Sequence, residues 1–275
     1  MDELISASDD SPSEIPKTRN PRAHLQAGQS PRARANEKLR TVLSWLMKWH
    51  YSSSAIVREL LGTTETNYLP QLLKKRYVRA VPAPSLLCGK IWMLSQDGLA
   101  AATQAAGIEI SYDLRPESIS HANVKHTLAA QRAILGLRAQ NIVHEFHPER
   151  LIGRPDLRGQ KRPDVECVNV ERNVKIAVEV ELSPKFGREL DMSLIAIVEG
   201  LRLQIFDCAI YVSPHQATLD RYRQAINVDI PEWWKPETPN KWIRSNRSIT
   251  LSDTERSRIY FVHRPDLLLG LEQLG

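Results

Sequence analysis

The chain has 275 residues, of which 42% are hydrophobic and 25% are charged, and this balance excludes a wholly disordered chain. No apolar run approaches the ~18 residues that a membrane-spanning helix needs, and the polar start MDELISASDD is unlike a signal peptide, so we expect a cytoplasmic protein with no membrane partner. The formal net charge of +5 favours an anionic partner such as nucleic acid, although many basic proteins bind none.

Residues 1–35 predict a disordered arm. Four prolines (Pro12, Pro16, Pro21 and Pro31) are spread among polar residues, and little in this stretch can be buried. The second half of the arm is basic, so it would either bind along the phosphates of a nucleic acid or form a solvated tail without a binding role.

Residues 36–112 predict a small helical domain that ends in a β-hairpin. Apolar residues at helical spacing predict three short helices, at about 39–47, 56–61 and 63–76. The extended runs RYVRAVPAP and KIWML flank a turn at 87–89, and a further helix follows at about 99–106. This is the order of a winged helix-turn-helix, and the phrase IWMLSQDGLAAA resembles the second wing strand and following helix of bacterial winged-helix domains.

That resemblance makes residues 63–76 the recognition helix. Its exposed side chains would face the major groove of double-stranded DNA or its phosphates, and they are Thr66, Asn67, Gln71, Lys74, Lys75 and Arg76. Winged-helix domains also serve in protein contacts alone, so this second interpretation stays open.

Residues 113–226 predict an α/β domain, which makes the whole chain α+β. A helix at about 118–140 precedes β-type runs at 142–147, 164–170, 174–182 and 207–213, and helical patterns lie at about 187–203 and 215–226. A turn at 171–173 joins two of the runs into a central hairpin. Residues 227–275 include a last β-type run at 258–262, and they would complete the core or contact DNA.

The central hairpin brings carboxylates together. Asp164 opens its first strand, and alternation places Glu179 and Glu181 on one face of its second strand, opposite Val178 and Val180. Two carboxylates inside an apolar strand are expensive to bury unless they bind a cation or are paired. Oxygen ligands of this kind suit Mg²⁺ or Mn²⁺, so the hairpin predicts a site for phosphodiester chemistry.

The arrangement resembles the PD-(D/E)xK nuclease superfamily, the fold of many restriction enzymes, with Pro163 and Asp164 as the PD and Glu179 as the second acid. This sequence departs from the pattern where the lysine should stand, because Glu181 occupies that position. The nearest candidate is Lys185, close to the next helix. By the resemblance it would orient the attacking water or stabilise the phosphate.

A more specific resemblance covers residues 120–213, with the run EVELSPK as its most specific element. Together with the preceding winged helix, it is similar to the replication-relaxation proteins and the MOB-C class of mobilization relaxases. That family implies metal-dependent nicking at an origin of transfer, with mobilization accessory or coupling proteins as partners. By the same analogy Glu145 joins the acidic site, and the expected DNA contacts near it are Arg158, Lys161, Arg162 and Arg188.

Other interpretations remain for these residues. The carboxylates can pair as surface salt bridges with Arg162, Lys175 or Lys185, and the protein would then be a DNA-binding regulator of plasmid replication or transcription with a degenerate site. A restriction nuclease is a third hypothesis. Tyr211, in an apolar strand, is expected in the core rather than acting as a nucleophile.

Two further residue types carry expectations. Cys88, Cys167 and Cys208 lie far apart without a CxxC pair, so they are expected to be buried thiols rather than zinc ligands or disulfides. The tryptophans of the last segment (Trp233, Trp234 and Trp242) are interspersed with basic residues, which suits single-stranded DNA or a partner protein. Closure of the domain's core is an equally good explanation.

Overall fold

The computed structural model describes residues 30–86, 89–153, 162–234 and 242–271, and these form a mixed α+β protein with several helices and three sheets. Most of the predicted arm lies outside the described residues. Its end was predicted wrongly, because helix α1 (Pro31–Trp49) begins inside it. Ser30 caps this helix by accepting a hydrogen bond from the Ala33 amide, and Pro31 follows at the first position, where its missing N–H costs nothing.

The N-terminal half contains four helices and a small antiparallel sheet. The elements after α1 are β1 (Tyr51–Ser52), α2 (Ser54–Leu60), α3 (Tyr68–Lys74), β2 (Val78–Pro82), β3 (Lys90–Leu94) and α4 (Gln96–Ala106). The strand order is β1-β3-β2, so the two-residue strand β1 extends the predicted hairpin at its β3 edge.

Helix α3 is half as long as predicted, and Pro70 explains why. A helix from Thr63 to Arg76 would place Pro70 in its interior, where the ring removes a hydrogen bond and clashes with the preceding turn. The helix instead begins at Tyr68, which puts Pro70 in the first turn, and it ends before Arg76, which has a positive φ of 60°. Thr66 and Asn67 therefore precede the helix.

The second half is built on a five-stranded mixed sheet. Its strands are β4 (Glu145–Pro148), β5 (Val165–Asn169), β6 (Val174–Val180), β7 (Cys208–Ser213) and β10 (Ile259–His263), in the order β10-β7-β6-β5-β4. Strand β5 is antiparallel to β4 and β6, whereas β6, β7 and β10 are parallel. The predicted central hairpin is thus β5–β6, and Asn173 takes a positive φ of 51° in its turn.

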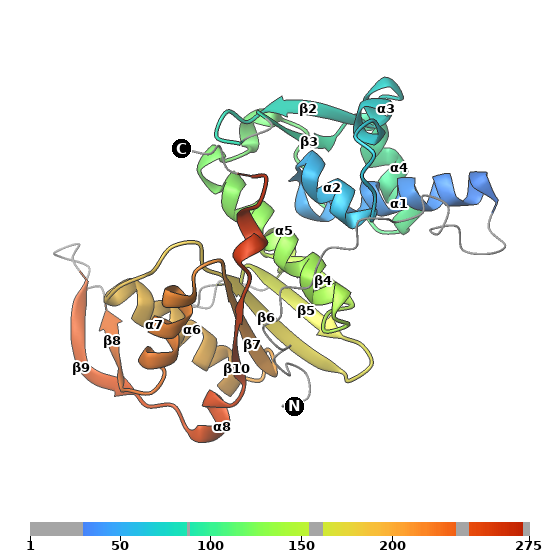
Figure 1. Ribbon diagram of the computed structural model, residues 1–275. Coiled ribbons are helices and arrows are strands. Elements are labelled where there is room, and N and C mark those ends of the chain that lie inside the picture. The colour runs from blue at the N-terminus through green and yellow to red at the C-terminus, as the bar shows by residue number, and fades with distance from the viewer. Residues whose placement is uncertain (1–29, 87–88, 154–161, 235–241, 272–275) are drawn as a thin grey trace.

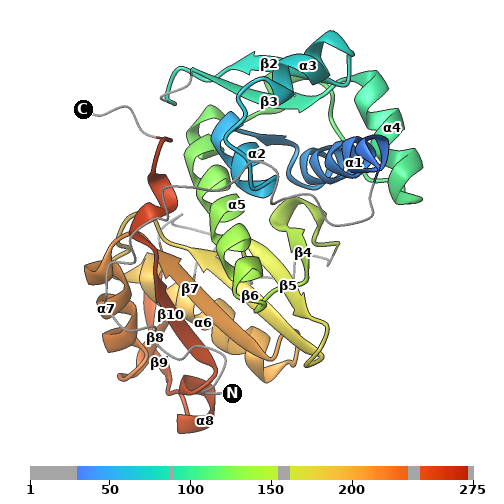
Figure 2. The ribbon, with the colours of Figure 1, turned by 45° about the vertical axis from the view of Figure 1, so that its right-hand side comes forward.

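Helices cover both faces of this sheet (Figures 1 and 2). Helix α5 (Val124–Ala139) lies on one face, and α6 (Arg188–Arg202) and α7 (Gln216–Ala225) lie on the other. Alternation along β6 divides the core accordingly: Val178 packs on the α5 side, and Ala177 packs on the α6 side. Cys167 and Cys208 are buried free thiols, as predicted, and Cys88 lies outside the described residues.

The remaining elements are a further hairpin and several short helices. The hairpin, β8 (Ile230–Trp234) and β9 (Ile243–Ile249), packs on α6, and helix α8 (Asp253–Arg256) precedes β10. Short 3-10 helices lie at Pro116–Ser118, His121–Asn123, Glu149–Leu151 and Pro265–Leu268. Within the described ranges, none of the helices has the length and apolarity that crossing a membrane requires.

The two halves share one hydrophobic core. The rings of Trp45 and Trp49 on α1 pack against Phe146 on β4, with ring centroids 5.3 and 5.7 Å from it. Gln131 on α5 is buried and bonds three groups of the N-terminal half: it accepts from the Trp45 indole (3.0 Å) and the Ser52 hydroxyl (2.6 Å), and it donates to the Tyr51 carbonyl (2.8 Å). Helix α5 therefore joins the small sheet to the large one.

Candidate functional site

Asp164 lies directly before β5 and reaches across to the end of β6. Its Oδ2 accepts a hydrogen bond from the Val180 amide at 2.7 Å. His126 on α5 lies on the same carboxylate, with Nε2 3.4 Å from Oδ2, and the same ring nitrogen is 2.9 Å from the Val180 carbonyl. Since Val165 pairs with Val178, the antiparallel register places Asp164 opposite Glu179. Asp164 and the acidic strand are therefore close together.

Glu179 and Glu181 are buried on the α6–α7 side of the sheet, with 2% and 3% of their surface exposed. Val178 and Val180 pack on the opposite side, together with α5, which confirms the predicted alternation. Glu179 faces Tyr211 on the neighbouring strand β7 in the parallel register. The two carboxylates thus point into the interior between the sheet and its covering helices.

Three hydroxyl groups lie around these carboxylates: Tyr211 on β7, Tyr222 on α7 and Ser193 on α6. Burial, followed by the nearby glutamates, raises the pKa of both tyrosines, so their hydroxyls stay protonated. Within the described ranges, none of the three hydroxyls makes a hydrogen bond of normal length and angle. The interior here is polar and under-satisfied, and Tyr211 is a core residue, as predicted.

Lys185 is the cation of this group. Its ammonium pairs with Glu181 Oε1, four residues earlier in the chain, and the lysine lies in the loop that leads to α6. The side chain of Lys185 is partly exposed, whereas that of Glu181 is not. The lysine thus connects the buried carboxylate to the surface and serves as its counter-charge.

The donor set suits a divalent ion only in part. Glu179, Glu181 and the three unsatisfied hydroxyls offer oxygen atoms alone, the ligands that Mg²⁺ and Mn²⁺ prefer. Asp164 does not converge with them, since it contacts the α5 side through His126. In the part of the chain that the structure describes, no three His, Cys, Asp or Glu side chains form a metal-binding group.

Glu145 stands apart from the other acids. It pairs with Val168, which pairs with Lys175, so Glu145 is two strands across and four residues along from Glu179. At ordinary strand spacings this separation is about 16 Å. The structure therefore does not bring Glu145 to the candidate site, because β4 is the edge strand and runs in the opposite direction to β5.

The predicted DNA-contacting residues lie in three places. Those of the recognition segment are all exposed on α3 or at its ends: Thr66, Asn67, Gln71, Lys74, Lys75 and Arg76. Arg158 and Lys161 lie outside the described residues, and Arg162 is half-buried next to Pro163. The guanidinium of Arg188 lies 5.3 Å from the ring centroid of Trp242. By contrast, Arg150 donates to the carbonyls of Met47, Lys48 and Ser111, so its guanidinium holds the end of α1 in place instead of contacting a phosphate.

Sequence reasoning missed His126, Ser193 and Tyr222. Each reaches the site from a helix, at a position that depends on how that helix crosses the sheet. No spacing in the sequence marks them, although polar residues on the buried face of an amphipathic helix were a usable signal for Ser193. No known family model, curated protein or solved structure matches this chain.

Proposed function

We propose that this protein is a Mg²⁺- or Mn²⁺-dependent DNA endonuclease that nicks one strand at an origin of transfer, like the mobilization relaxases that its sequence resembles. The observation that carries the proposal is the hydrogen bond from the Val180 amide to Asp164. It holds this carboxylate at the end of the strand that bears Glu179, beside the Glu181–Lys185 pair. Acids and a cation that lie together on a strand-turn-strand unit support the PD-(D/E)xK interpretation of this domain.

The N-terminal half supports a winged-helix role in DNA binding. Three helices precede the β2–β3 hairpin, and the exposed C-terminal end of α3 presents polar and basic side chains together with Leu73. Lys74, Lys75 and Arg76 form a basic cluster there, which suits the phosphates of double-stranded DNA.

The chemistry would take place at the outer end of β6. Glu179 and Glu181 would hold the metal ion, which when bound supplies a Lewis acid that activates water and neutralises charge on a phosphate. Lys185, partly exposed beside Glu181, would contact the phosphate. Asp164 holds the end of β6 through the Val180 amide, and its role as a third metal ligand stays a prediction.

A second function is favoured by one observation, the pairing of Lys185 with Glu181. This pair already neutralises one buried carboxylate, and the surrounding hydroxyls are available as hydrogen-bond donors. A buried acidic group satisfied in this way needs no metal. The protein would then be a DNA-binding regulator of plasmid replication or transcription without catalytic activity.

Nicking of supercoiled plasmid in Mg²⁺ or Mn²⁺ tests the first function. We expect relaxed circles from the wild-type protein, and none from Asp164→Ala or Glu179→Ala variants that still bind a DNA duplex. Activity that survives both substitutions would remove this site from consideration. Linear product with both strands cut would instead indicate a restriction-type nuclease.

Lys185→Met separates the two functions. If Lys185 acts on the phosphate, its loss should lower the nicking rate by about 100-fold, as for other removed transition-state donors, while duplex binding persists. Lys74→Met is the matched control, because Lys74 is exposed on α3 and should alter duplex binding only. No nicking by the wild-type protein, with unimpaired binding, would favour the regulator.

A further inference from the structure

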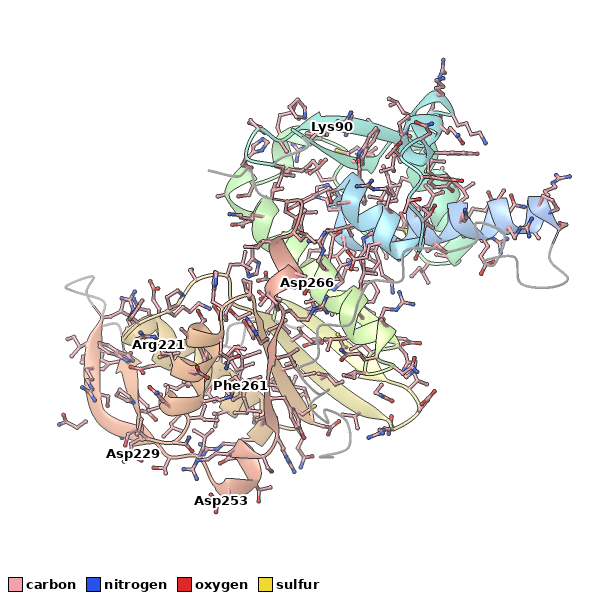
Figure 3. All side chains as sticks on the ribbon, viewed as in Figure 1. Lys90, Arg221, Asp229, Asp253, Phe261 and Asp266 are labelled. Carbon is pink, nitrogen blue, oxygen red and sulfur yellow. The ribbon has the colours of Figure 1, made fainter. Side chains whose placement is uncertain are left out.

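A row of aromatic and arginine side chains leads away from the candidate site. Phe186 follows Lys185 directly and is 57% exposed, and the guanidinium of Arg221 on α7 lies 4.0 Å from its ring centroid. Figure 3 labels Arg221 among the side chains of the second half. The row thus begins one residue from the lysine that pairs with Glu181.

The row continues onto the β8–β9 hairpin. Arg188, in the first turn of α6, places its guanidinium 5.3 Å from the ring centroid of Trp242, and the next residue, Ile243, pairs across the hairpin with Trp234. Trp234 is 51% exposed. By strand alternation Trp242 lies on the same face of the hairpin as Trp233, and Trp234 lies on the other face. We therefore give the name aromatic row to Phe186, Arg188, Arg221 and Trp242.

The hairpin is held firmly enough to present these rings. The Trp233 indole donates a hydrogen bond of 2.9 Å to Asp191 on α6, and β8 packs along that helix. Trp233 is therefore half-buried against α6, whereas its neighbour Trp234 faces outward.

The positive charge of this surface favours a nucleic-acid strand as its ligand. Lys185, Arg188 and Arg221 line the start of the row, and the exposed Arg244 lies opposite Trp233 on β9. Glu189 is an exposed acid beside Arg188, and the carboxylate of Asp191 is engaged by Trp233. Basic groups alternating with exposed rings suit unpaired bases that stack while their phosphates pair with arginines.

We propose that the aromatic row binds a single DNA strand and guides it to the Glu181–Lys185 end of the site. This proposal rests on the nuclease function for its purpose, although strand binding itself does not require cleavage. The row would hold the strand that is unpaired at the cut, while α3 contacts the duplex.

Fluorescence anisotropy of a labelled dT20 oligonucleotide, in EDTA so that no cleavage occurs, tests the row. Phe186→Leu and Trp242→Leu remove the two rings of the row and keep apolar side chains in their place, so folding should be retained. Each should weaken dT20 binding by about 5- to 150-fold, the range for loss of one base–aromatic stack, with under about two-fold change for a 20-base-pair duplex. Leu203→Ala, at another exposed apolar residue just after the C-terminal end of α6, should change neither affinity.

Unchanged dT20 affinity in both ring variants, or an equal loss on the duplex, overturns the proposal. So does a wild-type protein that nicks plasmid but does not bind dT20, a result that leaves the nuclease function standing. Ring-dependent dT20 binding without plasmid nicking supports strand binding by the row and contradicts the proposed nuclease function. Self-association that disappears in Trp242→Leu, with dT20 binding intact, would assign the row to contacts between copies of the chain.

Discussion

Glu255 shows how a single carboxylate holds an element in place. It forms a reciprocal capping box with Ser252 at the start of α8, and its Oε1 lies 2.6 Å from Arg202 Nε at the end of α6. The hydrogen bond from Arg202 is the largest of the effects that lower the pKa of Glu255 to about 2. The folded protein therefore favours the ionised form of this side chain.

That pKa predicts how stability depends on pH. Because the folded pKa lies below the ordinary value of 4.5, the stabilisation is fully present above about pH 4.5 and is lost as pH falls toward 2. Glu255→Gln should lower the free energy of unfolding at pH 7 by about 1 kcal/mol, since Arg202 is partly exposed and salt screens the pair. Urea denaturation should show the difference from wild type shrinking between pH 4.5 and 3. A difference that is constant with pH would contradict this.

At the candidate site, the residues that could be predicted were those fixed by local pattern. Asp164, Glu179 and Glu181 follow from a turn and a two-residue alternation, both of which are readable in the sequence. The direction in which the Asp164 carboxylate turns was not readable, because it depends on His126 from a helix that is distant in sequence. Long-range placement likewise decided that Glu145 lies at the sheet edge.

Among the elements, α5 is the one that packs on both the N-terminal half and the large sheet. Gln131 is its only side chain described here that bonds α1 and β1 at once, and it is completely buried. The next residue along the same helix, Arg132, donates to the carbonyls of Asp266, Leu267 and Leu269 and pairs with Glu59 on α2. The helix thus joins the N-terminal half and residues 266–269 to the large sheet.

Replacing Gln131 should therefore be costly. Gln131→Ala leaves the Trp45 indole and the Ser52 hydroxyl buried without their acceptor, and each such group costs about 1–3 kcal/mol. We expect a loss of about 3 kcal/mol in the free energy of unfolding, measured by urea denaturation. Gln140→Ala, at the exposed end of the same helix, is the matched control and should change stability by less than about 0.5 kcal/mol. Equal effects of the two would show that the buried bonds contribute nothing.

The elements that periodicity predicted well are those with a clear apolar stripe or an alternating strand, such as α6 and β6. The β8–β9 hairpin was not predicted, because its strands are interrupted by a register shift between Pro231 and Trp233 and β9 is mostly polar. Helix α3 was predicted too long because the apolar spacing continued past Pro70, and the backbone restriction of proline outweighed it.

At the scale of the whole molecule, one hydrophobic cluster crosses from the small sheet to the large one. It includes Ile91 and Met93 of β3, Leu128 and Ile134 of α5, and Val178 of β6. The sequence suggested separate compact regions, since each half has its own element pattern. Patterns reveal which face of an element is apolar but not which partner covers it.

A shared core predicts cooperative unfolding. With Trp233, Trp234 and Trp242 replaced by Phe, fluorescence reports only Trp45, Trp49 and Trp92 in the N-terminal half. Its urea midpoint should coincide with that of far-UV circular dichroism, which reports the whole chain, within about 0.2 M, as two-state behaviour requires. Two separated midpoints would show that the halves unfold independently.

The packing of Trp45 and Trp49 against Phe146 has a geometric consequence for the proposed function. It joins α1 to β4, and α3 shares a hydrophobic core with α1, so the position of α3 relative to the large sheet is set by the fold. Under the proposed function, the cut would therefore fall at one fixed offset, in base pairs, from the duplex segment that α3 contacts.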